Sequence, residues 1–233
     1  MPPPASTIAS PVPLPRLAVP TRVQSLQWAA GLAVACGLWL ARVPLAFLAG
    51  LAAADLASGL LHWAADTWGR SDLPWIGPRV LVPFRVHHVN PDDFLRRTFL
   101  DTNGDIAALT AVVLLALHAV PLDTTWGPVL VIAGAAFTGL GLWTNQIHQW
   151  AHQPDPPLVV RQLQAFGLIL RRDAHDRHHR HPHAGDYCIT TGWCNGVLGR
   201  LDLFRRMERI VTRLTGAVPR QDEAHWFDAP GAR

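Results

Sequence analysis

The sequence is poor in charge, and this scarcity already narrows the kind of protein that it encodes. Its 233 residues include no lysine, and charged residues together make up 16% of them, compared with roughly 25% in soluble domains. Hydrophobic residues account for 49% and are gathered into long runs. These features argue against an ordinary soluble enzyme and indicate a membrane protein, for which we expect no nucleic-acid partner.

Cysteine is scarce too, at three residues. Three thiolates cannot hold an iron–sulfur cluster, which takes four, and they cannot form a disulfide framework. The sequence also contains no Gly-x-Gly-x-x-Gly fingerprint for a dinucleotide. Redox chemistry by this chain would therefore need an external electron donor.

Four apolar segments predict helices that cross the membrane. Each is close to the roughly 20 residues that a helix needs to span the hydrocarbon core. Glycine and alanine, which let membrane helices approach closely, are frequent in the second and fourth. We therefore expect an all-α integral membrane protein with about four transmembrane helices. The segments are residues 25–41, 45–65, 105–122 and 128–150.

The remaining parts of the chain are predicted to lie outside the hydrocarbon core. Residues 158–172 suit an amphipathic helix at the interface, and residues 200–216 suit a surface helix on the polar side. The proline-rich residues 1–23 are expected to be disordered. This leaves one membrane domain over residues 24–220 and a short tail at 221–233.

The positions of arginine predict the orientation in the membrane. The connection 66–104 holds five arginines and the region after residue 152 holds twelve, whereas the connections 42–44 and 123–127 hold one between them. Positive charge collects on the cytoplasmic face, so both termini and the connection 66–104 are expected in the cytoplasm. The expected membrane is a bacterial inner membrane, or the endoplasmic reticulum in a eukaryote.

Histidine is abundant at the expected cytoplasmic ends of the spans. His62 and Asp66 lie four residues apart, as do His148 and His152, so each pair shares a helical face. Residues 173–188 hold five of the twelve histidines. Neutral imidazole is a common ligand of iron, zinc, copper and nickel, and nine histidines in a cytoplasmic cap suit two ions with four or five ligands each. The candidates are His62, His87, His88, His148, His152, His175, His178, His179 and His183.

Other polar residues are secondary candidates. Asp55 lies within a span, where an ionisable group is costly, and we expect it to support the metal site or to form a hydrogen bond across helices. Asn145 is expected to support the metal site. Asp66 is expected to bind the metal, to support a ligand, or to be a helix-end charge with no metal role. His118 is expected to be structural or lumen-facing, and His225 to be solvated. Four arginines either hold a phospholipid head group or serve only to orient the chain: Arg79, Arg85, Arg96 and Arg97.

Several motifs occur in an order that resembles a known family. They are DLASGLLHWAADTWG, PFRVHHVNP, DTNGD, TNQIHQWAH, LQAFGLIL and HDRHHRHPHAGDYCITTGWCN, within about residues 51–220. Together they resemble the plasmanylethanolamine desaturase family, also called Kua-like or CarF-like membrane lipid desaturases. Plant plastid desaturases that act on a phosphatidylglycerol acyl chain are similar. The resemblance assigns the nine histidines above to the metal site and leaves out His181.

The resemblance implies a membrane-bound, non-haem di-iron enzyme that uses O2. Removing two hydrogens from an unactivated CH2–CH2 unit needs a strong oxidant, which two irons and O2 can supply. The expected reaction introduces the vinyl-ether double bond into the sn-1 alkyl chain of plasmanylethanolamine, as in plasmalogen synthesis. A cytochrome b5-like protein or a ferredoxin would donate the electrons.

Two alternative functions are compatible with the same residues. One is desaturation or hydroxylation of an ester-linked acyl chain near the phospholipid head group, because substrate register rather than ligand identity decides the outcome. The other is a non-catalytic membrane metal-binding protein, which would be expected to carry more polar residues along its spans.

Overall fold

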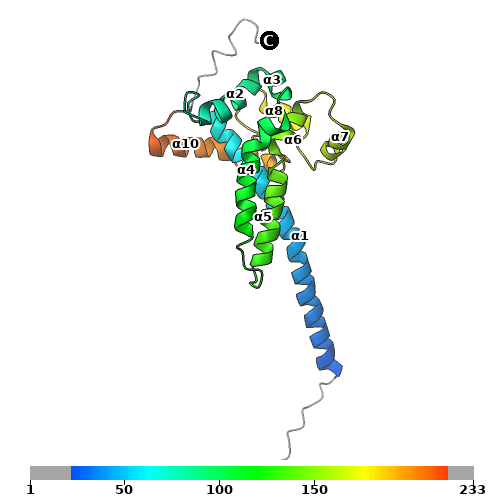
Figure 1. The fold of residues 1–233 in the computed structure, drawn as a ribbon. Coiled ribbons are helices and arrows are strands. Elements are labelled where there is room, and N and C mark those ends of the chain that lie inside the picture. Colours follow the sequence, from blue (N-terminus) through cyan, green and yellow to red (C-terminus); the bar gives the residue numbers. More distant parts are fainter. Residues whose placement is uncertain (1–21, 220–233) are drawn as a thin grey trace, which may run out of the picture. The chain divides into compact units, whose positions relative to one another are not determined.

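The computed structural model describes residues 22–219, and every regular element in that range is a helix. The predicted all-α class is confirmed for this part of the chain. The predicted tail, with His225, and residues 1–21 lie outside the described residues. Figure 1 shows the arrangement of the helices. They are α1 (Arg22–Thr67), the π-helix η1 (Gly77–Leu81), α2 (Val82–Val89), α3 (Pro91–Leu95), α4 (Phe99–Leu117), α5 (Gly127–Gly141), α6 (Thr144–His152), α7 (Leu158–Ala165), α8 (Arg172–His178), α9 (Asn195–Arg200) and α10 (Leu203–Thr215).

The first two predicted spans form one helix in the structure. α1 has 46 residues and includes Pro44, so the prediction of a connection at 42–44 is wrong. A proline inside a helix removes one backbone hydrogen bond, but helices in apolar surroundings tolerate this loss. The leucines and alanines on both sides are strong helix formers, and they carry the helix through this point.

The chain divides into two compact units at the same place, between Ala41 and Arg42. In the first unit the described residues 22–41 are exposed throughout. Trp28, Leu32 and Trp39 are among the large hydrophobic side chains that this helix leaves uncovered. An apolar surface of this extent is typical of a segment that contacts lipid or another apolar surface.

Three helical stretches of the described chain are long and apolar enough to cross a membrane. They are α1, α4 and the continuous stretch Gly127–His152 that joins α5 and α6. The number is one fewer than predicted because α1 unites two of the predicted segments. A continuous helix crosses the membrane once, so the 46 residues of α1 exceed the roughly 20 that one crossing needs.

The long helices of the second unit contact one another through small residues. α4 and α5 lie side by side (Figure 1), and Gly134 of α5 sits against Leu117 of α4. Gly50 of α1 lies against Ala133 and Ala136 of α5, so closely that a Cβ at Gly50 would collide with them. Close packing through glycine and alanine is typical of membrane helices.

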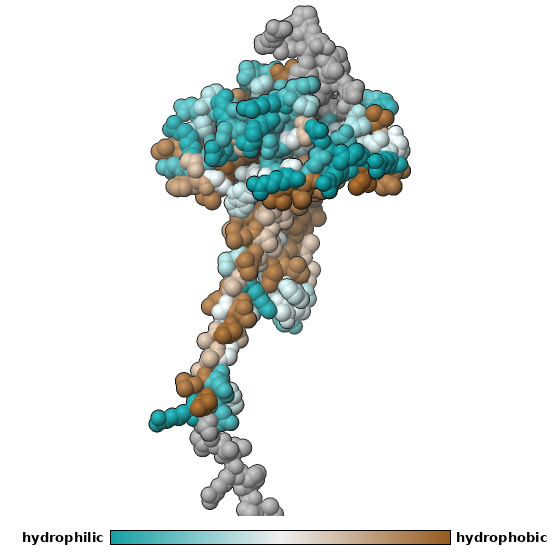
Figure 2. All heavy atoms as spheres, turned by 180° about the vertical axis from the view of Figure 1, so that it is seen from behind, coloured by the Kyte–Doolittle hydropathy of each residue, from teal (hydrophilic) through white to brown (hydrophobic). Residues whose placement is uncertain are grey.

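The other helices of the second unit form a group that we call the cap, made of residues 68–98 and 144–216. One hydrophobic cluster surrounds Ile147 and Leu170, and a second joins Trp63 at the end of α1 to Tyr187 and Phe204. Figure 2 shows hydrophilic side chains gathered over the cap and hydrophobic ones over the long helices. This division suits a protein partly embedded in a membrane and partly in water.

α2 positions two of the predicted ligands. His87 and His88, which lie in the predicted connection 66–104, are helical in the structure. Pro83 stands in the first turn of α2, where its missing N–H costs nothing. The helix ends at Val89, and the backbone of Asn90 leaves the helical region (φ −137°, ψ 79°), because the following Pro91 disfavours a helical conformation at this position.

Candidate metal centre

Eight histidines and one aspartate meet where α1, α2, α6 and α8 come together. Their ligand atoms fall into two groups, and within each group these atoms all lie within 4.8 Å of one another. Atoms that converge so closely can surround one metal ion per group. We call the groups the five-histidine set and the mixed set. The five-histidine set is His87, His148, His152, His175 and His179, and the mixed set is His62, Asp66, His88 and His178.

The period of the α-helix explains how two elements supply both sets. Successive residues of a helix point about 100° apart, so the adjacent His87 and His88 of α2 enter different sets. At α8, His175 and His179, one turn apart, enter the five-histidine set, whereas His178 faces the mixed set. The i, i+3, i+4 spacing of these three histidines by itself favours one shared helical face, whereas the structure divides them between the two sets.

In the five-histidine set, imidazole nitrogens crowd around His175. Its Nε2 lies 2.8 Å from Nε2 of His152 and 2.9 Å from Nε2 of His148. Nε2 of His179 is 3.0 Å away. A neutral imidazole carries one N–H, so these three contacts at a single atom cannot all be hydrogen bonds. Imidazole nitrogens whose lone pairs converge in this way can be stabilised by a cation that binds between them.

Burial keeps these imidazoles in the metal-binding form. Desolvation, reinforced by neighbouring imidazoles, holds the pKa values of His87 and His175 well below the usual histidine value. The same two causes lower the pKa of His179. Nε2 of His87 is buried and has no hydrogen-bond partner within the described part of the chain. Neutral, desolvated nitrogens of this kind fit a transition-metal ion.

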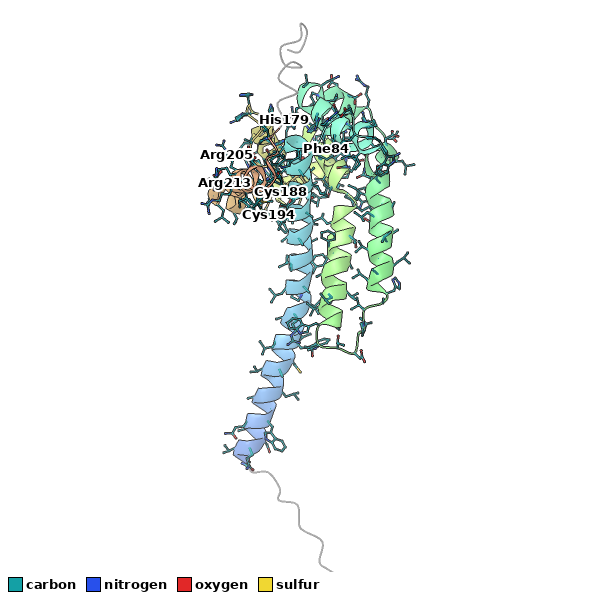
Figure 3. All side chains as sticks on the ribbon, turned by 90° about the vertical axis from the view of Figure 1, so that its left-hand side faces the viewer. Phe84, His179, Cys188, Cys194, Arg205 and Arg213 are labelled. Atoms are coloured by element: carbon teal, nitrogen blue, oxygen red, sulfur yellow. The ribbon has the colours of Figure 1, made fainter. Side chains whose placement is uncertain are left out.

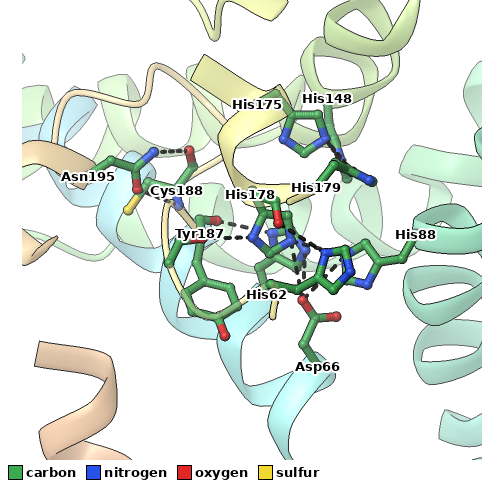
Figure 4. Close-up of polar contacts among 12 residues, drawn as sticks. His62, Asp66, His88, His148, His175, His178, His179, Tyr187, Cys188 and Asn195 are labelled. Carbon is green, nitrogen blue, oxygen red and sulfur yellow. Dashed lines mark hydrogen bonds and ion pairs between the residues drawn. The ribbon is translucent and has the colours of Figure 1, made fainter. Parts of the chain in front are cut away.

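The mixed set surrounds the carboxylate of Asp66 (Figure 4). Oδ2 of Asp66 lies 3.1 Å from Nε2 of His62 and 3.5 Å from Nε2 of His178. Nε2 of His88 is 3.6 Å from the same oxygen and 3.0 Å from Nε2 of His178. Three imidazoles and one carboxylate are a donor set that suits iron. Asp66 thus lies among the candidate ligands themselves.

Two backbone carbonyls orient two histidines of the mixed set by contacting Nδ1, the ring nitrogen that faces away from the set. Nδ1 of His62 lies 3.1 Å from the carbonyl oxygen of Tyr187, and Nδ1 of His178 lies 2.8 Å from that of Gly185. A carbonyl can only accept, so each Nδ1 carries the proton and each Nε2 presents its lone pair to the set. This arrangement around metal-binding histidines fixes both tautomer and ring orientation.

Asp55 does not reach the ligands directly but holds the segment 187–195. The side chain is fully buried. Its Oδ1 accepts the backbone N–H of Thr191 at 2.7 Å and of Gly192 at 2.9 Å, and its Oδ2 accepts that of Cys194 at 2.9 Å. The carboxylate therefore replaces the hydrogen bonds that these backbone groups would otherwise make with water. The sequence assigns no role to this segment, which the structure joins to α1.

Further contacts fix the same segment against α1. Asn195 pairs with the backbone of Cys188 in both directions, at 2.8 and 2.9 Å. The N–H of Ile189 donates to Oγ of Ser58 at 3.1 Å. Gly59 lies directly beneath Cys188, and no side chain fits there. The Tyr187 carbonyl that orients His62 is thus held at a defined place.

The cysteines of this segment are not suited to bind metal. Burial raises the pKa of the Cys188 thiol well above its usual value. Burial, with the nearby Asp55, raises the pKa of Cys194 to about 11. Both thiols are therefore protonated at neutral pH, whereas a metal ligand must be a thiolate. Figure 3 shows both on the side of the cap near α10.

Three other histidines lie outside the two sets. The ring of His183 stacks on that of His88 at 4.9 Å, and its Nδ1 lies 3.1 Å from the carbonyl oxygen of His178. His181 is exposed. His118 is exposed at the end of α4, with Nδ1 2.8 Å from the carbonyl oxygen of Leu114. The structure therefore brings together eight of the nine predicted histidines and places His183 beside them.

A hollow opens next to the five-histidine set. Its buried end is formed by His87 and His148 with Phe84 and Phe94, and its exposed end by charged and polar side chains. An apolar approach that ends on two candidate ligands is suited to a hydrocarbon chain. The polar lining consists of Arg79, Arg97, Asp101, Thr102 and Asn145.

The four arginines considered for a head group divide into two kinds. Arg79 and Arg97 line the hollow, and Arg96 joins them around the adjoining surface depression. Arg79 donates to Asp105 at 2.6 Å, and Arg97 donates to the neighbouring Asp93 at 2.8 Å. Arg85 is fully buried and donates to backbone carbonyls at 2.9 and 3.2 Å. Arg85 therefore faces the interior.

Two amides on α6 shape the hollow from the same helix that supplies His148. Asn145, predicted to support the metal, donates to the carbonyl oxygen of Thr102 on α4. Gln149 donates to the carbonyl oxygens of Phe94 and Arg97 at 2.6 and 3.0 Å. The connection between α3 and α4 is thereby fixed relative to the ligands. The sequence gives no signal for Gln149.

Comparison with known proteins follows the same part of the chain. Residues 51–222 match the lipid desaturase domain family. The chain is 38% identical to the plasmanylethanolamine desaturase of Myxococcus xanthus over 80% of its own length and 66% of that protein. It is 41% identical to plasmanylethanolamine desaturase 1 of Mus musculus, over 79% of its own length and 70% of the mouse protein.

A plant relative and the solved structures complete the comparison. The chloroplastic fatty acid desaturase 4 of Arabidopsis thaliana is 36% identical over 79% of this chain and 57% of the plant protein. No solved structure matches. The chain thus spans about two thirds of the length of the first two relatives. The family predicted from the motifs is confirmed, and the chain belongs to the lipid desaturase family.

Proposed function

We propose that this protein is an O2-dependent, non-haem di-iron desaturase that introduces the vinyl-ether double bond into the sn-1 alkyl chain of plasmanylethanolamine. The observation that carries the proposal is the pair of adjoining ligand sets. The rings of His87 and His88, one from each set, have centroids 4.3 Å apart, and those of His62 and His148 are 5.6 Å apart. Two ions held in these sets would be close enough to act on one O2 molecule.

The proposed ligands are the residues of the two sets. The eight histidines and Asp66 would hold two iron ions, which when bound supply the oxidising power for C–H cleavage. His183 would orient His88 and His178, and Asp55 and Asn145 would position the surrounding backbone. The overall change converts a CH2–CH2 unit and O2, with two electrons and two protons from outside, into a double bond and two waters.

The hollow supports the assignment of a lipid substrate. Phe84 and Phe94 would exclude water from a hydrocarbon chain that enters toward His87 and His148. Arg79, Arg96 and Arg97 would hold the phosphate at its exposed end. Because charged and apolar linings lie so close together, the reactive carbons would be those near the head group. This depth suits the bond next to an sn-1 ether.

The proposed setting is the cytoplasmic face of a bacterial inner membrane. The connection after α1 and the region after α6 are rich in arginine, as cytoplasmic segments are. Three crossings, by α1, α4 and the stretch Gly127–His152, would place the connection after α1 and the region after α6 on this side. An external donor, a cytochrome b5-like protein or a ferredoxin, would supply the two electrons.

A second candidate is desaturation of an ester-linked acyl chain. The 36% identity to a chloroplastic fatty acid desaturase favours it, because the same ligands and a hollow near the head group would serve either linkage. Whether an ether-linked or an ester-linked chain is desaturated would depend on the register of the lipid chain in the hollow.

The decisive experiment uses a host that lacks plasmalogens. The full chain is expressed with supplied alkyl-ether phosphatidylethanolamine, and lipids are analysed by mass spectrometry for acid-labile vinyl ethers, with iron measured on the purified protein. We expect vinyl ethers and about two irons per chain. Bound iron without vinyl ethers, but with a new double bond in an ester-linked chain, would support the second candidate. Clearly fewer than two irons in active protein would contradict the di-iron assignment.

A further inference from the structure

α10 presents a strongly basic face to solvent. Arg205, Arg206, Arg209 and Arg213 are all exposed, and the only carboxylate within the helix is Glu208. Positions 205 and 209 lie one turn apart and share a face. Figure 3 shows Arg205 and Arg213 on the outer side of the cap. Surface positive charge of this density is suited to an acidic partner.

The other faces of α10 are already in use. Phe204, Met207 and Val211, at a spacing of three and four residues, pack into the cluster around Trp63 and Tyr187. Ile210 and Leu214 are exposed and apolar, and at about 100° per residue they point away from Arg205 and Arg209. The apolar flank therefore suits the lipid surface, and the face with Arg205 and Arg209 is turned toward water.

An aromatic contact chain runs from α10 to the mixed set. The rings of Phe204 and Tyr187 have centroids 4.8 Å apart, and those of Tyr187 and His178 are 5.1 Å apart. The backbone carbonyl of the same Tyr187 accepts a hydrogen bond from His62. α10 is thus connected to two candidate ligands through a single intervening residue.

A surface depression lies at the start of this chain. Phe204 and Arg205 line it together with Gly185 and Asp202. Gly185 is also the residue whose carbonyl oxygen orients His178. A partner that binds to the arginines would therefore lie over the aromatic contact chain that leads to the mixed set.

We propose that the arginine face of α10, with Arg205 and Arg209 at its centre, is the docking surface for an acidic one-electron carrier protein. The inference rests on the proposed desaturase function, which needs two electrons for each O2 reduced. Each docking event would transfer one electron, oxidising the haem or iron–sulfur centre of the carrier by one unit. Two successive events, with two protons from water, balance one desaturation. The five-histidine set, which borders the hollow, would remain accessible to substrate while the carrier is bound to α10.

Two matched variants test the docking surface. Arg209 and Arg161 each pair with one exposed aspartate, at 3.5 and 3.1 Å, and each has a side chain 54% exposed. They lie on α10 and α7, on opposite sides of the cap in Figure 1. Arg209→Glu and Arg161→Glu therefore make the same change of charge in similar surroundings, but only the first alters the proposed surface.

The measurement is binding, independent of turnover. The full-length iron-loaded protein is placed in nanodiscs of phosphatidylcholine, alone or mixed with anionic phosphatidylglycerol. It is titrated at low and high salt with two acidic probes, the soluble haem domain of cytochrome b5 and a [2Fe–2S] ferredoxin. We expect at least one probe to bind, and Arg209→Glu to raise its Kd about tenfold at low salt. Arg161→Glu should leave the Kd within about twofold, and high salt should remove the difference.

Three outcomes would overturn the inference. They are binding of neither probe to the wild-type protein, equal effects of the two substitutions, and an Arg209→Glu effect that appears only as altered dependence on anionic lipid, which would assign the arginines to the membrane surface. A parallel single-turnover reaction with dithionite-reduced protein separates this result from the proposed function. Failure to desaturate lipid there would contradict the function, whereas donor binding reports on the surface alone.

Discussion

The two ligand sets lie next to each other but in unlike surroundings. The five-histidine set borders the hollow, where Phe84 and Phe94 form an apolar approach. The mixed set contains the only carboxylate of the two groups and is backed by the segment 187–195, which Asp55 fixes to α1. This difference suits the proposed division of work, in which substrate would approach the five-histidine set, and structural support and electrons would reach the mixed set.

The difference is also one of ligand chemistry. Five neutral imidazoles leave the charge of a bound cation uncompensated, whereas Asp66 in the mixed set offsets one unit of it. The mixed set should therefore hold its ion more firmly. Site-specific substitutions can separate the sets, and the following predictions run from the largest expected effect to the smallest.

The largest effect is expected for His148→Ala, which removes a ligand that also lines the hollow. Iron should fall from about two to about one per chain, and vinyl-ether formation should fall at least about 100-fold, because first-layer ligands matter more than the outer contacts whose loss costs 10–100-fold. Metal analysis and lipid mass spectrometry measure both. His118→Ala, a change far from both sets, should leave both unchanged; if it behaves like His148→Ala, the assignment fails.

Asp66→Asn should remove the charge that distinguishes the mixed set while preserving its shape. Iron affinity of this set should weaken about 10–100-fold, and half of the iron should be lost on dialysis against a chelator that leaves the wild type loaded. Asp101→Asn provides the matched control, since this carboxylate serves the capping box of α4. Equal iron retention in Asp66→Asn and wild type would mean that Asp66 is no ligand.

Asp55→Ala should act through the backbone and not through the metal. Three buried N–H groups would lose a charged acceptor, which should destabilise the protein by about 3 kcal/mol and lower Tm by about 10 °C. Thermal unfolding in detergent checks this. Asp155→Ala, which breaks an exposed pair with Arg161, should change Tm by no more than about 2 °C. A Tm change equally small for both would refute the role assigned to Asp55.

The smallest effect is expected on the substrate side. Arg79→Ala should raise KM for the phospholipid about fivefold and change kcat less than twofold, because an exposed charge contributes about 1 kcal/mol to binding. Arg70, which pairs with Asp72 away from the hollow, gives the control Arg70→Ala. An unchanged KM for Arg79→Ala would place the phosphate elsewhere.

Sequence periodicity explains what could be foreseen of the site. His148 and His152 are one turn apart on α6 and enter the same set, as helical spacing predicts. Helical spacing does not assign His178 to a set. The side chains of His175, His178 and His179, at positions i, i+3 and i+4, spread over an arc of the helix surface that is wide enough to reach both sets. The sequence does not decide whether Asp66 binds the metal or supports a ligand, since a carboxylate at a helix end has several ordinary uses.

The fold was predictable in class but not in its connections. Hydropathy locates the apolar segments, but it does not reveal that residues 42–44 continue the helix through Pro44. Contacts between residues far apart in the sequence are also not predictable from the sequence alone. Asp55 and Thr191 are 136 residues apart, and only the packed structure shows that the buried carboxylate belongs to a loop and not to the metal.

That same contact has a consequence for biosynthesis. His62 and Asp66 leave the ribosome long before His178, and the loop that orients His62 is anchored only once Cys194 has been made. During most of its synthesis and insertion, the nascent chain thus carries only some of the residues of the two ligand sets. The proposed iron would therefore be loaded after translation, as a separate maturation step.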